Sequence, residues 1–316
     1  MRVGIAIDVS TDVSHDFVVQ NHIHVLPSTL HMNGHSAVYD RDPEKAMVFY
    51  RDHLADKGID AETTPFSVKE IEDLFLKRLV LEYDYVFLIT LMATRSLTFD
   101  NAHKASFTIL QSYDTVRTAK SVPGPFALRV VDSESLFTGP GVLAWEAVRM
   151  AKEGHSPVDM RKRLDDLIPH TYAYLVPEDL YYIRARATRR GDHSVSLAAY
   201  VIGSALDIKP IIKANRSETT PVAKVRHHPK AVEKLFLHGA AQIRRGLLVP
   251  MVNLSYGGDP LELAKMPGYS ELTRAAAEKG VELMLSMMAP AAAVNIGGGA
   301  VTMAYCAQDA GDFEGS

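Results

Sequence analysis

The chain has 316 residues, 47% of them hydrophobic and 23% charged, which is ordinary for a globular protein and long enough for two domains. Its formal net charge of −4 comes from 34 basic and 38 acidic residues spread along the chain, which argues against binding to nucleic acid or anionic lipid surfaces. Cys306 is the single cysteine, so the composition excludes an intramolecular disulfide and a thiolate zinc site.

The sequence predicts neither a targeting signal at its start nor a membrane-spanning helix in its most apolar stretch. The first ten residues hold too short an apolar run for a signal peptide. The most apolar long stretch, residues 284–301, is interrupted by Pro290, Asn295 and three glycines, so it lacks the pattern of a membrane-spanning helix. With the single cysteine, these observations predict a cytoplasmic protein without stable membrane insertion.

The first half of the chain alternates short apolar runs with helical patterns. Ser67 can cap a helix in which apolar residues recur at three- and four-residue spacing, and a second helix is predicted over 99–119. The alternation favours strand–helix units and a mainly parallel sheet with flanking helices. The predicted strands of this sheet are 3–7, 22–30, 85–90 and 126–131.

Residues 129–154 change character halfway. An apolar strand ends at Asp132 and Ser133, a Gly-Pro-Gly turn follows, and a long apolar helix then runs to Gly154. Ligands of open α/β sheets bind at the carboxyl ends of strands, which makes the two polar side chains candidate site residues. Small polar side chains beside a turn also satisfy backbone amides, and the residues alone leave both interpretations open.

The second half contains more strands and fewer clean strand–helix pairs, which predicts a second α/β or α+β domain. We place the boundary near 165, giving domains at 1–165 and 166–308 and a disordered tail at 309–316. Helices are predicted near 178–186, 229–244 and 260–279. The predicted strands are 171–176, 205–212, 221–226, 247–256, 281–287 and 300–307.

Several clusters of residues in the sequence could indicate a different kind of site. Four histidines lie within residues 22–35, but no acidic residue lies between Asp16 and Asp40, so we expect no metal site. The chain has neither GxGxxG nor a phosphate-binding loop, which argues against nucleotide binding, and no nucleophile–base pair indicates an enzyme. Four arginines form either a solvated face or a patch that docks an acidic partner: Arg184, Arg186, Arg189 and Arg190.

Taken in order, the motifs resemble the DegV family of bacterial fatty-acid-binding proteins, which includes the binding subunits of fatty acid kinase. The resemblance covers about residues 3–305. It rests on the segments IDVSTD, ETTPFSVKEIEDLF, SLTFDNA, VVDSESLFTGPG, GSALDIKPII and NIGGGA.

The resemblance implies two α/β domains with one long acyl chain between them and a carboxylate held by hydroxyls at the domain interface. It implies a binding protein of phospholipid metabolism that has no cofactor and no catalysis of its own. A separate fatty acid kinase would convert the presented carboxylate to an acyl phosphate. Two other functions stay open: an enzyme that acts on a small carboxylate or acyl ester in the same cleft, and a carrier or sensor of another amphiphile.

The chain departs from the family pattern around the expected head group. Met92 and Ala93 stand where the family usually has two serines, and Asn295 replaces a histidine. Met92, Ala93, Asp132 and Ser133 are expected to support the site rather than contact the ligand directly. The residues that we expect to bind the carboxylate are Thr63, Thr64, Ser96, Thr98, Asn295, Gly297, Gly298 and Gly299.

Overall fold

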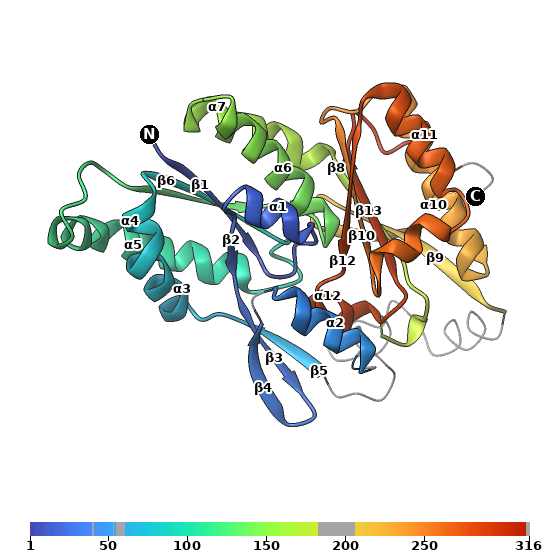
Figure 1. The fold of residues 1–316 in the computed structure, drawn as a ribbon, viewed down its shortest axis with the longest axis horizontal. Coiled ribbons are helices and arrows are strands. Elements are labelled where there is room, and N and C mark those ends of the chain that lie inside the picture. The colour runs from blue at the N-terminus through green and yellow to red at the C-terminus, as the bar shows by residue number, and fades with distance from the viewer. Residues whose placement is uncertain (40, 53, 55–60, 183–205, 314–316) are drawn as a thin grey trace.

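The computed structural model describes residues 1–39, 41–52, 54, 61–182 and 206–313, which form three β-sheets with helices packed around them (Figure 1). The first sheet is wholly parallel, in the order β2-β1-β6-β7. It confirms the predicted mainly parallel sheet. Its strands are β1 (Val3–Asp8), β2 (His24–Leu26), β6 (Tyr85–Thr90) and β7 (Ala127–Asp132).

The second sheet has six strands in the order β10-β9-β8-β13-β11-β12. Neighbouring strands are antiparallel except β11 and β12, which are parallel, so the prediction of a second α/β unit is confirmed. Its strands are β8 (Thr171–Val176), β9 (Ile208–Asn215), β10 (Glu218–Arg226), β11 (Met251–Tyr256), β12 (Glu282–Met287) and β13 (Val301–Cys306).

The third sheet was not predicted. We call the part built around the parallel sheet the first lobe and the part built around the six-stranded sheet the second lobe. The third sheet is antiparallel, in the order β4-β3-β5, and extends from the first lobe (Figure 1). The apolar run 22–30 was predicted as one strand, but β2 ends before Pro27, which has no backbone N–H to continue the ladder, and β3 begins after it. The strands are β3 (Ser28–Met32), β4 (His35–Tyr39) and β5 (Ala61–Pro65).

Helices α3 (Val68–Leu74) and α5 (Thr98–Ala119) cover one face of the parallel sheet. The predicted cap is present, because Ser67 and Glu70 each accept a hydrogen bond from the other's backbone amide. The helix then continues through a π-helical turn at Phe75–Leu79 into α4 (Val80–Glu82).

Helix α6 (Thr138–Lys152) lies between the two large sheets, as Figure 1 shows. It is buried on nearly every side, which explains why its sequence is apolar beyond a single face. Its residues Val142 and Leu143 share one core cluster with Ile7 of β1 and Ala304 of β13. The two lobes therefore share a core, to which α7 (Pro157–Leu167) is attached.

The outer face of the six-stranded sheet is covered by α10 (His228–Arg245) and α11 (Tyr269–Lys279). Residues 260–279 were predicted as one helix, but a short 3-10 helix at Pro260–Lys265 is separated from α11 by Pro267 and by Gly268, whose φ is 82°. The other short helices among the described residues are α1 (His15–Gln20), a 3-10 turn at Ile168–His170, α2 (Pro43–Arg51) and α12 (Pro290–Ile296).

The segment after 308, for which the sequence predicts disorder, is packed as far as residue 313. The ring of Phe313 stacks on His238 with 3.9 Å between ring centroids. The carbonyl of Ala310 accepts hydrogen bonds from the hydroxyls of Tyr174 and Tyr305 at 3.2 and 3.1 Å. Burial of one aromatic side chain thus orders a stretch whose composition is otherwise small and polar. The boundary near 165 stays a prediction.

Candidate functional site

An apolar cluster occupies the junction of the small sheet, α2, α12 and the six-stranded sheet. We call it the junction cluster. It draws side chains from both lobes, which distinguishes it from the cores under the outer helices. Its buried members are Val9, Leu30, Tyr39, Phe49, Ala61, Phe137, Leu175, Met288, Ala289, Ala291, Ala292, Ala293, Val294, Ile296 and Ala300.

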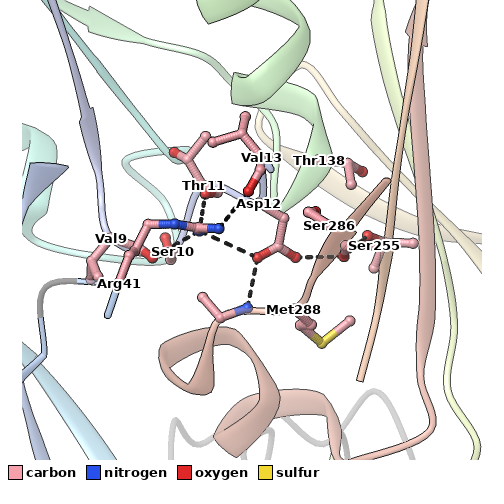
Figure 2. A network of polar contacts seen from close by, with 12 residues as sticks. Val9, Ser10, Thr11, Asp12, Val13, Arg41, Thr138, Ser255, Ser286 and Met288 are labelled. Carbon is pink, nitrogen blue, oxygen red and sulfur yellow. Dashed lines mark hydrogen bonds and ion pairs between the residues drawn. The ribbon is translucent and has the colours of Figure 1, made fainter. Parts of the chain in front are cut away.

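A buried carboxylate ties the loop after β1 to the second lobe (Figure 2). Asp12 is fully buried, and its Oδ1 accepts a hydrogen bond from the amide of Ala289 at 2.8 Å. Its Oδ2 accepts one from Ser255 Oγ at 2.6 Å, and Ser255 Oγ lies 2.7 Å from Thr302 Oγ1. One side chain therefore joins the loop after β1 to β11 and to the start of α12, and Ser255 extends the network to β13.

The backbone around Asp12 is fixed as firmly as its side chain. Asn253 Nδ2 donates to the carbonyls of Asp12 and Thr138, at 2.6 and 2.9 Å. The amide of Asp12 donates to the carbonyl of Phe137 at 2.9 Å. A Cβ on Gly141 would lie 2.3 Å from Asn253 Nδ2, so a glycine is needed where α6 passes this contact.

Arg41 is the basic partner in this network and comes from the segment that leads into α2. Its Nη1 lies 3.7 Å from Asp12 Oδ1, and its guanidinium donates to the carbonyls of Thr11 and Val13, the latter at 2.7 Å. Burial raises the pKa of Asp12 to about 6, although Arg41 and the hydrogen bonds from Ser255 and Ala289 oppose that shift. The carboxyl group therefore titrates near neutral pH.

A second buried carboxylate, Asp8, lies at the end of β1. It accepts hydrogen bonds from the amide and hydroxyl of Ser10 at 2.8 and 2.5 Å, and from the amide of Leu91 at 2.5 Å. Burial raises its pKa. Strand order changes direction between β1 and β6, so Asp8 links the loops at the switch point where open α/β sheets bind ligands.

The strand β5 separates the two predicted threonines. Thr63 is half-buried and shares a face with Ala61 of the junction cluster, opposite Leu30 in register. Thr64 lies on the other face, is exposed, and has its Oγ1 3.0 Å from His31 Nε2. Only Thr63 is therefore positioned beside the cluster.

Ser96 and Thr98 contact each other at the start of α5. Their hydroxyl oxygens are 2.8 Å apart, and Ser96 Oγ accepts from the amide of Thr98 at 3.2 Å. Asn101 of the same helix donates through Nδ2 to the carbonyl of Phe66 at 2.8 Å. This bond connects the start of α5 to the segment that leaves β5, so the structure places these hydroxyls near the end of the strand that carries Thr63.

Met92 and Ala93 differ in their surroundings. Met92 is fully buried and belongs to the core between the parallel sheet and α6. Ala93 is half-buried, and its amide lies 3.3 Å from each carboxylate oxygen of Asp132. The side chain of Met92 thus fills the core, and Ala93 is the member of the pair that lies nearer the surface.

The polar pair after β7 binds backbone amides. The carboxylate of Asp132 also accepts from the amide of Glu134 at 2.9 Å, and burial raises its pKa. Ser133 Oγ accepts from the amide of Ser135 at 3.2 Å. Of the two interpretations that the sequence left open, these contacts support the one in which both side chains hold the turn that leads into α6.

Asn295 and the glycines end α12. Asn295 Nδ2 donates to the carbonyl of Ala291 at 2.8 Å within the helix. The amides of Gly297 and Gly299 donate to the carbonyls of Ala293 and Gly257, at 2.7 and 2.8 Å. Two of the three expected amide donors therefore already have partners in the protein. Gly297 and Gly299 also have positive φ, and a Cβ on either would collide with Tyr182 or Glu178.

The four arginines predicted to dock a partner, Arg184, Arg186, Arg189 and Arg190, lie outside the described residues. Within the described part of the chain, no three His, Cys, Asp or Glu side chains are grouped to hold a metal ion. His24 and His31 instead contact hydroxyls, Tyr83 at 3.0 Å and Ser36 at 2.7 Å. No helix among the described residues is long and apolar enough to cross a membrane.

A cavity of about 710 Å³ opens between α1, α2 and the end of β12. Tyr39, Arg41, Ala46, Leu285 and Met287 contribute to its wall. Sequence reasoning missed this cavity and the Asp12 network because both depend on contacts between residues more than 200 positions apart. The one local signal we used was the IDVSTD segment, which contains Asp12 and which served only as a motif of the family resemblance.

These features define a two-lobed α/β protein with an apolar cluster and buried polar groups where the lobes meet. A model of the DegV family, described as uncharacterised proteins, matches residues 2–308, so the chain belongs to the DegV family. A DegV domain-containing protein of Xanthomonas campestris pv. campestris is 46% identical over 308 residues, which is 98% of each chain.

Two solved structures have the same fold. One is a DegV lipid-binding protein of Thermotoga maritima, with a TM-score of 0.74 and 23% identity over 98% of this chain and 99% of that one. The other is DegV of Bacillus subtilis, a fatty acid binding protein, with a TM-score of 0.74 and 20% identity over 97% and 99%.

Proposed function

We propose that this protein binds one long-chain fatty acid, with the acyl chain in the junction cluster, and presents its carboxylate to a partner fatty acid kinase. The observation that carries this proposal is the junction cluster itself, which is apolar, lies between the lobes and has the half-buried Thr63 beside it. The names of the Bacillus and Thermotoga family members, which refer to fatty acid or lipid binding, support the choice of ligand.

The energetics of such a ligand suit a cluster without special residues. Transfer of about fifteen methylenes from water into an apolar site gives roughly 12 kcal/mol of gross driving force before ordering costs are subtracted. Selectivity for the acid must then come from the head group, because a buried carboxylate needs hydrogen-bond donors.

We infer that Thr63 binds the carboxylate, since it borders the junction cluster, while Ser96 and Thr98 approach from the start of α5. Asn295 and the amide of Gly298 complete the proposed set at the end of α12. The amides of Gly297 and Gly299 would join only if their present hydrogen bonds to Ala293 and Gly257 were broken.

The kinase partnership follows from the family resemblance and from the absence, in the sequence, of a nucleotide-binding motif. The protein would therefore act as a non-catalytic binding subunit, and phosphoryl transfer would belong to the partner. The arginines between 184 and 190 are the proposed docking residues for that partner.

Native mass spectrometry of the purified protein tests ligand binding directly. We expect one bound mass that matches a long-chain fatty acid and that is released by organic solvent. Recovery of no lipid, together with no rise in melting temperature on addition of palmitate or oleate, would contradict the proposal. An unliganded protein that hydrolyses acyl esters would instead support an enzyme.

Thr63→Val and Thr64→Val form a matched pair that tests the head group, because the two threonines lie on opposite faces of β5. Loss of one hydrogen bond to a charged group costs about 1.5–3 kcal/mol, so Thr63→Val should weaken binding of oleic acid roughly ten- to a hundredfold. Binding of methyl oleate should change far less, and Thr64→Val should change neither. Equal losses for acid and ester would show that Thr63 only shapes the cavity.

A further inference from the structure

Helix α2 is attached to the molecule in an unusual way. It covers the junction cluster, yet only Ala46 and Phe49 of its nine residues are buried, and Met47 and Val48 are exposed on its outer side. It follows β4 in the chain and lies beside α12 and the small sheet in Figure 1. Few apolar contacts therefore hold it in place.

Two polar anchors, one at each end of α2, attach it to other parts of the described chain. Before the helix, the guanidinium of Arg41 reaches into the loop after β1, where it binds the carbonyls of Thr11 and Val13 and faces Asp12 (Figure 2). Near the last turn, the hydroxyl of Tyr50 donates to the carbonyl of Met288 at 2.8 Å. Both anchors end on backbone that borders the junction cluster.

The backbone at the first anchor is strained. Arg41 has a φ of 67°, in the left-handed region that side chains other than glycine rarely adopt. Its hydrogen bonds must hold it there, so their loss would favour a different path for the chain that leads into α2. The left-handed backbone conformation of Arg41 thus favours release of the first anchor.

The 710 Å³ cavity reaches this anchor from outside. Arg41 and Tyr39 both line it, and Tyr39 is also a buried member of the junction cluster. Val25 likewise borders both the cavity and the cluster. The cavity and the cluster are therefore separated by the residues that α2 and its anchor hold in place.

We propose that α2 is a clasp, and that its release from Arg41 and Tyr50 joins the outer cavity to the junction cluster and lets the acyl chain pass. The nature of the passing ligand rests on the proposed function. Release of α2 breaks a few hydrogen bonds and uncovers Phe49, whereas movement of α6 would open the core shared by both lobes. Release of α2 therefore costs less than movement of α6.

A clasp that is closed both with and without ligand makes a specific kinetic prediction. Weaker anchors favour the open form equally in the free and the bound protein, so the association and dissociation rate constants rise by the same factor. The Kd, which is their ratio, then stays constant. A residue that contacts the ligand would instead change the Kd mainly through dissociation.

The experiment compares Tyr50→Phe and Arg41→Met with the control Arg51→Met. Arg51 lies on the same helix and is exposed, and among the described residues it pairs with its neighbour Asp52. Hydrogen exchange of residues 43–51, measured without lipid, should accelerate about fivefold in Tyr50→Phe and ten- to a hundredfold in Arg41→Met. Binding and release of the fluorescent fatty acid cis-parinaric acid, followed by stopped flow, should accelerate by matching factors.

Each result decides one part of the inference. Unchanged exchange of α2 in both anchor variants would overturn the clasp whether or not the protein binds lipid, and Tyr50→Phe keeps this test available if Arg41→Met fails to fold. Faster exchange with unchanged parinaric acid rates would show that the chain passes elsewhere, while the proposed function stands. A wild-type protein that binds no fatty acid, with α2 exchange altered as expected, would overturn the ligand and leave the clasp.

Discussion

Helices α6 and α2 represent two ways of holding a helix. Eleven of the fifteen residues of α6 are buried, and it lies between the two large sheets without a side-chain cap. Two of the nine residues of α2 are buried, and it depends on an Asp42 cap and on the Arg41 and Tyr50 anchors. Burial between the two large sheets holds α6, whereas α2 has few buried residues and is attached by directed polar bonds, which is why we propose α2 as the element that moves.

The largest expected effect comes from a cavity in α6. Leu143→Ala removes three buried heavy atoms from a fully buried core position and should lower the free energy of unfolding by about 3 kcal/mol, within the usual range of roughly 2–5. Urea denaturation measures this loss. Phe49→Ala in α2 is the comparison, and we expect a smaller loss there because the helix can relax or detach. An equal loss would remove the contrast between the two helices.

The next effect is a pH dependence at the polar junction. The pKa of Asp12 is raised to about 6 in the folded protein against about 3.9 in an unfolded chain, so its stabilising contribution is fully present below 3.9 and is lost as the pH rises through 6. Relative to Asp12→Asn, the wild type should lose up to about 3 kcal/mol of stability between pH 4 and pH 7.

Chemical denaturation of both proteins across that pH range tests the sign. Asp8 is present in both proteins, but its charge raises the pKa of Asp12, so its own titration cancels only in part in the difference. A wild type that gains stability over Asp12→Asn as the pH rises would show that the Arg41 ion pair outweighs the cost of burying the carboxylate.

The smallest effect concerns helix caps. Asp42→Ala removes the cap of α2, and Ser156→Ala removes the cap of α7, which packs on α6. Each should cost about 1 kcal/mol locally. In Asp42→Ala the change should appear as faster hydrogen exchange confined to residues 43–51, whereas in Ser156→Ala it should appear in global unfolding. Faster exchange throughout the protein in Asp42→Ala would show that α2 is coupled to the core.

Much of the fold could be predicted because the information is local. The strands of the parallel sheet are short apolar runs, and the Ser67 cap and the glycine after α6 are sequence signals of helix ends. The hairpin of β3 and β4 also had a local signal, which is the dipeptide Asn33-Gly34. Both residues have positive φ, as a tight two-residue turn requires. Likewise, Pro290 at the start of α12 and Gly297 at its end mark a short helix.

The site was harder to predict because its contacts join distant segments. Nothing near Arg41 in the sequence indicates that its guanidinium will meet the loop after β1, and the partners of Asp12 lie in the last quarter of the chain. Thr63 and Thr64 are equivalent in composition, and only the pairing of β5 with β3 decides which one faces the cluster. The sequence shows the residue types, but it does not show which residues become neighbours in the fold.

The position of α6 also bears on how such a protein can change over generations. Its sequence belongs to the first half of the chain, yet its side chains pack against one face of the six-stranded sheet in the second half. If gene fission or recombination divided the chain near residue 165, each product would expose apolar side chains that the other half covers in this structure. We therefore expect the separate halves to fold poorly, and we expect variation of this architecture in its surface loops rather than by exchange of halves.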